Sequence, residues 1–341
     1  MAFAYNSRSA LTWRFNNRKG RINMKRLPMV LVTVVMTLAA CGGTSTASTA
    51  SGGPGKVDSI ASEVPDSIKS LAPLQIATDA TYAPNEFINP DTGEIEGWDI
   101  DLGKAICKVM GVACTFNNVI FSNIIPQLKA DNPRYIFSLS SFTPTEEREK
   151  SGIDFITYYK AGEAWIVKAS GGPTVNSAAD MCGRTVAVET GTTEESDAWG
   201  YMGKQVGGTA IAGDKDNCAA ASKQPIKVSS FEKQTDANTA LVSGRAEILW
   251  LDQPVAGYQV KQSGGKMKLG GQPCSVAPYG LALVKGSPLE KALTDAIKYL
   301  IDNGYYATIM KKWGVEEGSL NNSEVKLNDN NAIGSSCVPS Y

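Results

Sequence analysis

The chain has 341 residues, of which 43% are hydrophobic and 20% are charged, and its formal net charge is −1. This length is sufficient for two domains that each bury a core, and the composition is that of an ordinary globular protein. The absence of a basic excess argues against nucleic acid as a partner. The sequence contains no histidine, which excludes Ser-His-Asp and Cys-His catalysis, histidine zinc sites and histidine pH switches.

The N-terminal region has the pattern of an export signal. The basic pair Lys25-Arg26 precedes an apolar run from Leu27 to Ala40, whose 14 residues are short for a membrane-spanning helix but suit a signal peptide. Leu38-Ala39-Ala40-Cys41 resembles a bacterial lipobox, in which the cysteine is lipidated; the alternative is a plain signal peptide with an incidental cysteine. We therefore expect residues 1–40 to be a leader and lipoprotein signal peptide, and Cys41 to carry a lipid anchor.

The segment after Cys41 has the composition of a linker. Residues 41–73 are rich in Ser, Thr, Gly and Ala and show little apolar periodicity. We expect them to form a flexible tether that connects the lipid to a folded part beginning near Leu74. The folded part would then lie outside the cytoplasm, anchored to the outer face of the cell membrane.

Strand and helix patterns alternate from Leu74 onward. Leu74–Thr78 is a predicted strand, Leu102–Val109 has the apolar spacing of a helix, and residues 112–116 are the next predicted strand. This alternation predicts an α/β fold with mostly parallel sheets. Ligands of such sheets bind beyond the carboxyl ends of the strands, so the residues that follow each strand are the first candidates for a site.

One such candidate is the stretch from Ser140 to Arg148. Thr143, Pro144 and Glu146 form a capping box with proline at the first helical position, which predicts the start of a helix. Helix N-termini attract anions, and the Arg148 guanidinium lies about one turn further on, so the stretch suits a small carboxylate. The alternative, which this stretch alone favours, is a capped surface helix with a solvated arginine.

Several motifs taken together resemble one protein family. They are Thr78-Asp79-Ala80-Thr81-Tyr82-Ala83-Pro84, Gly97-Trp98-Asp99-Ile100-Asp101-Leu102, Gly191-Thr192-Thr193, Gly244-Arg245-Ala246-Glu247 and Lys312-Trp313-Gly314. In this order, over residues 74–318, they resemble family 3 bacterial solute-binding proteins, the extracytoplasmic receptors of polar amino acid ABC importers, among them the lysine/arginine/ornithine- and glutamine-binding proteins. Trp98 is a mild departure, because the family usually has Phe, Tyr or an aliphatic residue there.

The resemblance implies the two-lobed periplasmic-binding-protein type II fold, in which one amino acid binds in the cleft between two α/β lobes. Lobe 1 would comprise residues 74–162 and 279–320, and lobe 2 would comprise residues 168–274. The hinge crossings would be 162–168 and 278–284, and residues 321–341 would form a C-terminal tail. Closure of the lobes around the ligand would present a shape that a membrane permease recognises.

The same resemblance assigns partners to the ligand carboxylate. Arg148 matches the carboxylate-binding arginine of the family, with Ser140, Ser141 and Thr143 beside it. In lobe 2, Thr192 stands three residues before Glu195 as a second capping box, so Thr192 and Thr193 would face the same carboxylate from a second helix start. The alternative for that segment is an ordinary strand–helix turn.

The ligand ammonium and side chain also have matching residues. Asp252 follows a buried strand and matches the ammonium-binding aspartate; the alternative is a helix cap before Pro254. Tyr82 and Phe121 match the aromatic pair that encloses the ligand side chain, and Asp79 matches a position that contacts polar or cationic side chains. Because Asp79, and Glu189 with it, would be surplus negative charge, we expect a ligand with a cationic or amide side chain.

Six cysteines remain after Cys41, and in an exported protein they are expected to form disulfides. Six cysteines allow 15 connectivities, so the sequence alone does not choose among them. The resemblance implies Cys107–Cys114, after which Cys182–Cys218 would close a loop in lobe 2 and Cys274–Cys337 would fasten the tail. A metal or redox site is the rival interpretation, which the lack of a Cys-x-x-Cys motif disfavours.

These observations favour a monomeric binding protein without cofactor, metal or catalytic residues. The first alternative is an enzyme of the same fold, similar to cyclohexadienyl dehydratase, which would use Glu189 or Glu194 as a positioned acid. The second is the ligand-sensing subunit of a signalling receptor. Fold alone does not separate these readings, because function resides in the site.

Overall fold

The computed structural model describes residues 53–331 and 336–338, so the predicted leader and the lipid-anchor residue Cys41 lie outside the described part. The strands are β1 Leu74–Thr78, β2 Thr81–Tyr82, β3 Glu86–Ile88, β4 Ile95–Glu96, β5 Cys114–Asn118, β6 Phe137–Phe142, β7 Ile153–Lys168, β8 Thr185–Glu189, β9 Lys227–Phe231, β10 Ile248–Asp252 and β11 Met267–Val284. The α-helices are α1 Asp58–Ala61, α2 Asp66–Lys69, α3 Trp98–Val109, α4 Phe121–Leu128, α5 Glu146–Lys150, α6 Thr193–Gly200, α7 Asn217–Ala220, α8 Gln234–Ser243, α9 Gln253–Gln262, α10 Glu290–Asp302 and α11 Tyr305–Trp313, and the 3₁₀ helices are η1 Ala178–Met181, η2 Glu316–Gly318 and η3 Asn322–Glu324. None of the described helices has the length and apolar character that crossing a membrane requires.

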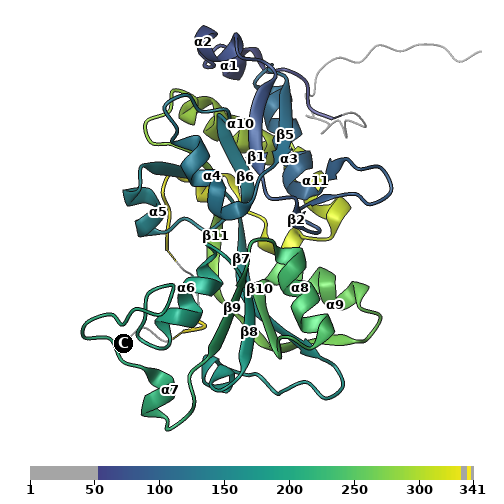
Figure 1. The fold of residues 1–341 in the computed structure, drawn as a ribbon. Helices are drawn as coiled ribbons and strands as arrows, with labels where there is room; N and C mark the ends of the chain where they lie inside the picture. The colour runs from purple at the N-terminus through teal and green to yellow at the C-terminus, as the bar shows by residue number, and fades with distance from the viewer. Residues whose placement is uncertain (1–52, 332–335, 339–341) are drawn as a thin grey trace, which may run out of the picture. The chain divides into compact units, whose positions relative to one another are not determined.

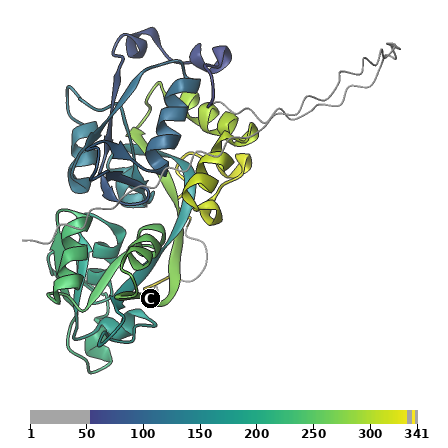
Figure 2. The ribbon, with the colours of Figure 1, turned by 90° about the vertical axis from the view of Figure 1, so that its right-hand side faces the viewer.

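One eight-stranded sheet runs through the folded part, in the order β5-β1-β6-β11-β7-β10-β8-β9. Strands β5, β1 and β6 are parallel to one another, and so are β10, β8 and β9. The long strands β7 and β11 lie antiparallel between these two groups and connect them (Figures 1 and 2). The group with β1 is lobe 1 and the group with β8 is lobe 2, as the two-lobed fold requires.

The crossings lie a few residues from the predicted positions. Residues 163–167 of β7 already pair with β10 of lobe 2, and Gly280 and Ala282 of β11 pair with β6 of lobe 1. Between them, Ala161 pairs with Ala277 and Lys160 with Pro278, in a part of the ladder that belongs to β7 and β11 alone. The expected crossings at 162–168 and 278–284 are therefore corrected to the region around these two pairs.

Helix α3 packs against the strands of lobe 1 because one of its faces is apolar. Leu102, Ile106 and Val109 are fully buried at helical spacing. Trp98 begins the helix, is fully buried, and its indole N–H donates to Asn85 Oδ1 at 2.8 Å. The larger residue at this position therefore fills core space and also pairs its polar atom, as buried tryptophans usually do.

The predicted tether is partly folded. Residues 53–73 contain α1 and α2, and Ile60 and Val64 are 6% and 1% exposed within the core of lobe 1. The expected flexible segment therefore does not extend to residue 73, because the buried side chains of Ile60 and Val64 dock this short segment on lobe 1. The composition of the segment as a whole concealed these two residues.

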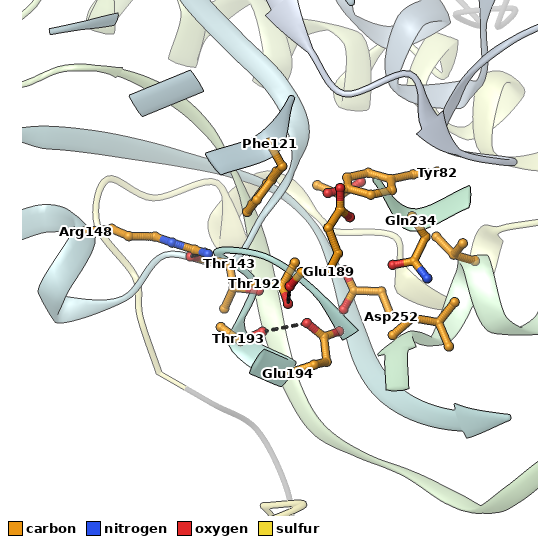
Figure 3. A pocket seen from close by; sticks show the side chains of 13 residues that line it. Tyr82, Phe121, Thr143, Arg148, Glu189, Thr192, Thr193, Glu194, Gln234 and Asp252 are labelled. Carbon is orange, nitrogen blue, oxygen red and sulfur yellow. Dashed lines mark hydrogen bonds between the residues drawn. The ribbon is translucent and has the colours of Figure 1, made fainter. Parts of the chain in front are cut away.

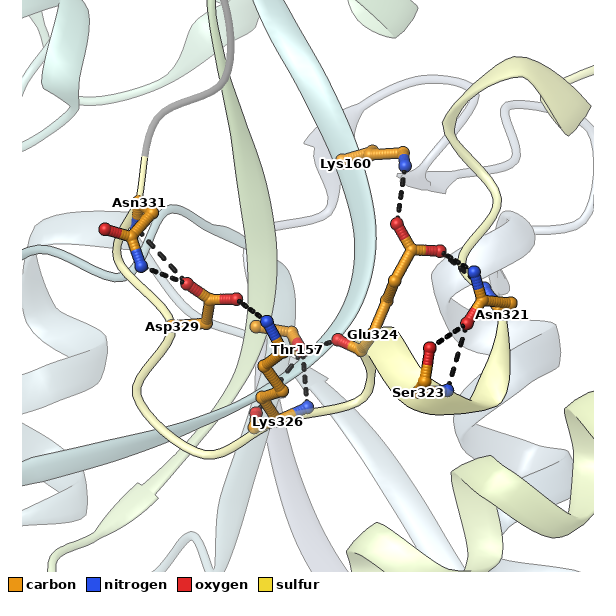
Figure 4. Close-up of polar contacts among 8 residues, drawn as sticks. All are labelled: Thr157, Lys160, Asn321, Ser323, Glu324, Lys326, Asp329 and Asn331. Carbon is orange, nitrogen blue, oxygen red and sulfur yellow. Dashed lines mark hydrogen bonds and ion pairs between the residues drawn. The ribbon is translucent and has the colours of Figure 1, made fainter.

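The C-terminal segment is packed along β7 (Figure 4). Thr157 exchanges backbone and hydroxyl hydrogen bonds with residues 324–326, with distances from 2.7 to 3.3 Å. Lys160 forms an ion pair with Glu324 at 2.9 Å. Asn328 then bonds the backbone of Phe155 through both its own backbone and its side chain. Residues 324–328 thus cover the open edge of β7 in lobe 1.

All three expected disulfides are formed: Cys107–Cys114, Cys182–Cys218 and Cys274–Cys337. The first joins the end of α3 to β5, and the second closes a loop in lobe 2. The third attaches the C-terminal segment to β11, where Cys337 is buried in the core of lobe 2.

These disulfides should differ in their contribution to stability. Cys274–Cys337 closes a sequence separation of 63 residues and Cys107–Cys114 one of 7. Chain-entropy arithmetic then gives losses of about 4 and about 2 kcal/mol for the respective double Cys→Ser variants. Urea unfolding of the two variants measures this order, and an equal or reversed order would contradict the prediction.

Candidate functional site

A pocket lies between the two lobes, where the carboxyl ends of the parallel strands meet (Figure 3). Lobe 1 contributes residues from β2, β6 and the starts of α4 and α5, and lobe 2 contributes residues from β8, α6, α8, β10 and α9. Apolar residues of both lobes also form one continuous buried cluster beside it. The lining residues are Tyr82, Phe121, Ser141, Thr143, Arg148, Glu189, Thr192, Thr193, Glu194, Gln234, Leu251, Asp252 and Val255.

Arg148 spans the two lobes with its guanidinium. Nη1 donates to the carbonyl oxygen of Thr143 at 2.6 Å, and Nη2 donates to that of Gly191, in lobe 2, at 2.8 Å. The guanidinium lies 5.4 Å from the centre of the Phe121 ring and 5.3 Å from that of Phe142, distances typical of cation–π contacts. Desolvation lowers the pKa of Arg148 from its ordinary value, but the group remains a cation.

The helix start before Arg148 differs from the prediction. The N-cap of α5 is Thr145, whose hydroxyl accepts from the Arg148 backbone N–H at 3.2 Å, and Thr143 precedes the helix. Strand β6 ends at Phe142, and residues 143–145 connect it to helix α5. Helix α5 is only five residues long, so the guanidinium of Arg148, rather than the helix dipole, is the candidate group for an anion here.

The second predicted helix start is confirmed. Thr192 is the N-cap of α6, and its hydroxyl accepts from the Glu195 backbone N–H at 3.3 Å. The reciprocal half of the capping box differs, because the Glu195 carboxylate accepts from the Gly191 N–H instead. The side chains of Thr192 and Thr193 both line the pocket opposite Arg148.

Carboxylates gather in lobe 2 beside these threonines. Asp252 occupies the N-cap position of α9, but its side chain makes no capping hydrogen bond and lines the pocket. Desolvation, and then the charge of Glu194, raise the pKa of Asp252 well above its ordinary value. Glu163 is also buried, and its pKa is raised by desolvation and by Glu194. Arg148 is the cation that lowers the pKa of both Glu194 and Asp252.

This acidic group is not arranged as a metal site. Among the residues that the structure describes, no three Asp, Glu or Cys side chains could hold a metal ion together. Buried carboxylates without a metal must be compensated by protons, by Arg148 or by a cationic ligand group. Asp252 is therefore available to an ammonium group that enters the pocket.

The opposite end of the pocket is aromatic and acidic. The Tyr82 and Phe121 rings meet edge to face with their centres 6.0 Å apart. Glu189, the last residue of β8, lines the pocket and is 1% exposed. Asp79 does not line the pocket, because Oδ1 accepts from the Thr81 hydroxyl at 2.6 Å and Oδ2 from the Phe121 N–H at 2.8 Å.

Ser141 is held in an unusual conformation by a buried network. Its φ is +52°, a left-handed value that is uncommon for a residue with a side chain. Its N–H donates to Asp99 Oδ2 at 3.2 Å, and its hydroxyl accepts from Asn85 Nδ2 at 2.9 Å and contacts the Glu86 carboxyl at 3.4 Å. The Tyr158 hydroxyl donates to Asp99 Oδ2 at 2.8 Å. Segments far apart in the chain thus fix the backbone of one pocket residue.

The fold and the pocket can now be compared with known proteins. A family model described as bacterial extracellular solute-binding proteins, family 3, matches residues 74–316. This chain belongs to that family.

The matches to named relatives extend over most of the length of each relative. The arginine-binding protein ArgT of Corynebacterium glutamicum is 33% identical over 267 residues, which cover 78% of this chain and 82% of ArgT. The ABC transporter glutamine-binding protein GlnH of Bacillus subtilis is 30% identical over 297 residues, covering 85% and 97%. The solved structure of an ancestral arginine-binding protein bound to arginine is 33% identical, with a TM-score of 0.60, and covers 70% of this chain and 97% of its own. The expected type II fold is confirmed.

Most residues expected from the family resemblance meet in this one pocket, with two exceptions. Asp79 and Ser140 lie behind it, where the Ser140 hydroxyl accepts from the Asp79 N–H at 2.8 Å. Four lining residues were not predicted as ligand contacts: Glu194, Gln234, Leu251 and Val255. Leu251 and Glu194 are sequence neighbours of the predicted residues Asp252 and Thr193, and this adjacency could have indicated that they line the pocket. Gln234 and Val255 enter from α8 and α9, and no local pattern marks them.

The Ser141 network also predicts a pH effect on the stability of this family 3 protein. Burial, and then the charge of Asp99, raise the pKa of Glu86 well above its ordinary value of 4.5, and burial raises that of Asp99 to about 7. The folded chain therefore holds protons that the unfolded chain releases. The contribution of these two groups to the free energy of unfolding is fully present at a pH below their pKa values in the unfolded chain. It decreases as the pH rises above those values, by up to about 1.4 kcal/mol per pH unit for each proton.

Glu86→Gln should remove part of that dependence, because the amide imitates the protonated carboxyl. We expect the variant to gain stability relative to the wild type between pH 5 and pH 8. Chemical unfolding at both pH values measures the difference. If the variant and the wild type differ in their free energy of unfolding by the same amount at both pH values, Glu86 does not hold a proton in the folded protein.

Proposed function

We propose that this protein is the substrate-binding receptor of an ABC importer, and that it captures a free amino acid and delivers it to a membrane permease. In this proposal it is a monomeric lipoprotein, anchored through Cys41 to the outer face of the cell membrane. The relatives that are named as arginine- and glutamine-binding proteins support the ligand class. The lipobox-like sequence before Cys41 supports the anchor.

The observation that carries the proposal is the pairing of Arg148 and Asp252 across one pocket. Arg148 belongs to lobe 1 and offers the paired N–H donors of its guanidinium. Asp252 belongs to lobe 2 and offers a carboxylate that makes no capping hydrogen bond to helix α9. A free amino acid carries the two complementary charges on one carbon atom, and both need partners when buried. Thr192 and Thr193 supply further donors for the carboxylate.

Capture by closure follows from this division of contacts. The Arg148 fork bonds two backbone carbonyls in this structure, and a ligand carboxylate would replace these neutral acceptors with charged ones. A ligand that contacts both lobes has its full affinity only for the closed form and therefore shifts the population toward it. The β7–β11 connection is the place where the lobes would rotate. No chemical step on the ligand is needed.

The side-chain end of the pocket favours a cationic or amide group. Tyr82 and Phe121 supply aromatic surface, and Glu189 supplies a buried carboxyl group. An acidic ligand side chain would add a further carboxylate to this end. An aliphatic side chain would leave Glu189 buried without a partner, which is costly.

A thermal-shift screen across the free amino acids tests the proposal. A ligand at about 100 times its Kd should raise the Tm by about 5 °C or more, because it binds only the native state. Arg148→Ala should abolish the shift. Arg134→Ala is the matched control, because Arg134 is exposed in lobe 1 and does not line the pocket, and it should retain the shift. A shift that persists in Arg148→Ala would refute the carboxylate assignment.

An enzyme similar to cyclohexadienyl dehydratase is the second candidate. The observation that favours it is Glu194, a buried carboxyl that lines the pocket near Arg148 and whose pKa is raised by desolvation. Such a group could donate a proton to a bound substrate. Turnover of prephenate or arogenate by the purified protein would support this candidate, and an unaltered bound amino acid would count against it.

A further inference from the structure

Glu189 is a buried pocket residue whose two carboxylate oxygens both lack a hydrogen-bond partner among the described residues. The residue is 1% exposed, and neither Oε1 nor Oε2 has a hydrogen-bond partner in the structure. Burying an unpaired carboxylate costs several kcal/mol, so this position is unfavourable for folding. A buried charged group that is aimed into a pocket without a partner indicates a ligand group that completes it.

The charged groups near Glu189 are acidic and do not compensate its charge. Desolvation raises its pKa, and the negative charge of Asp79 raises it further. The Tyr82 side chain lies beside it and lowers its pKa, although the Tyr82 hydroxyl makes no hydrogen bond of good geometry in the structure. Glu194 adds to the negative field from α6. Glu189 and Tyr82 thus leave three unpaired polar atoms at one end of the pocket (Figure 3).

Asp79 differs from Glu189 although both are buried acids. Both Asp79 oxygens are used inside lobe 1, by the Thr81 hydroxyl and the Phe121 N–H, and the residue does not line the pocket. Desolvation raises the pKa of Asp79, while these two hydrogen bonds and the charge of Lys233, an exposed residue of lobe 2, lower it. Both Asp79 oxygens therefore have partners within lobe 1, and one of these bonds holds the backbone of Phe121 in place.

We propose that Glu189, rather than Asp79, determines ligand specificity by pairing with a cationic group at the end of the ligand side chain. This inference rests on the proposed function and narrows its ligand class from cationic or amide to cationic. A guanidinium can donate to both oxygens of Glu189 at once, and the Tyr82 and Phe121 rings can flank its planar face. An amide group fits less well, because its carbonyl oxygen would have to lie among carboxylate oxygens.

Arginine and citrulline provide the sharpest test, because they have the same shape and differ in the charge at the end of the side chain. We expect calorimetry at pH 7 to give arginine at least about a 30-fold lower Kd than citrulline. In Glu189→Gln the ratio should fall below about 5-fold, through weaker arginine binding, while citrulline and glutamine binding is retained. Asp79→Asn should leave the ratio above 20-fold.

Three outcomes would overturn the inference. The first is equal binding of arginine and citrulline by the wild type, the second is an unchanged ratio in Glu189→Gln, and the third is loss of the ratio in Asp79→Asn alone. These outcomes leave the proposed function intact, since an amino acid still binds. If arginine, lysine, ornithine, citrulline and glutamine all fail to bind, the proposed ligand class itself has failed.

A measurement on the unmodified protein guards against a variant that does not fold. If Glu189 holds a proton in the free protein, arginine displaces it and citrulline does not. Calorimetry in two buffers of different ionisation enthalpy counts the protons released by each ligand. Proton release that is larger for arginine than for citrulline supports the pairing, and equal affinity of the unmodified protein for both ligands in the same titrations overturns it.

Discussion

The burial of several acidic side chains between the two lobes is the constraint on which the structure of the pocket depends. Glu163, Glu189, Glu194 and Asp252 all belong to lobe 2, and all have raised pKa values because desolvation opposes their ionisation. Arg148 reaches them from lobe 1. Each lobe is therefore electrostatically incomplete at its cleft face, and a cationic ligand of the kind proposed would complete both. On that proposal, the charge of the ligand is coupled to the closure of the two lobes.

Much of the fold could be predicted because strands and helices are encoded locally. Leu74–Thr78 is a strand in both the prediction and the structure, and α3 has the expected apolar face. The residues at strand ends could be predicted for the same reason, since parallel strands bring Asp252 and Glu189 to one edge. Family motifs then supplied Arg148, Tyr82 and Phe121, which periodicity alone does not distinguish from core or surface residues.

What the sequence did not reveal depends on tertiary contacts. The N-cap of α5 is Thr145 rather than the predicted Thr143. Strand β6 extends through Phe142, and that extent is set by sheet pairing rather than by local propensity. Ile60 and Val64 fold part of the predicted tether because lobe 1 offers them a buried surface. Asp79 and Glu189 looked equivalent as surplus acids, and only the hydrogen bonds to Asp79 separate them.

The bond from Arg148 to the Gly191 carbonyl has a consequence for affinity. On the proposed function, this bond gives lobe 2 the same guanidinium that the ligand carboxylate would bind. A ligand would then bind only the fraction of molecules in which the bond is broken, and the observed Kd would be the intrinsic Kd divided by that fraction. Because the acceptor is a backbone carbonyl, the competing group would not depend on any side chain of lobe 2.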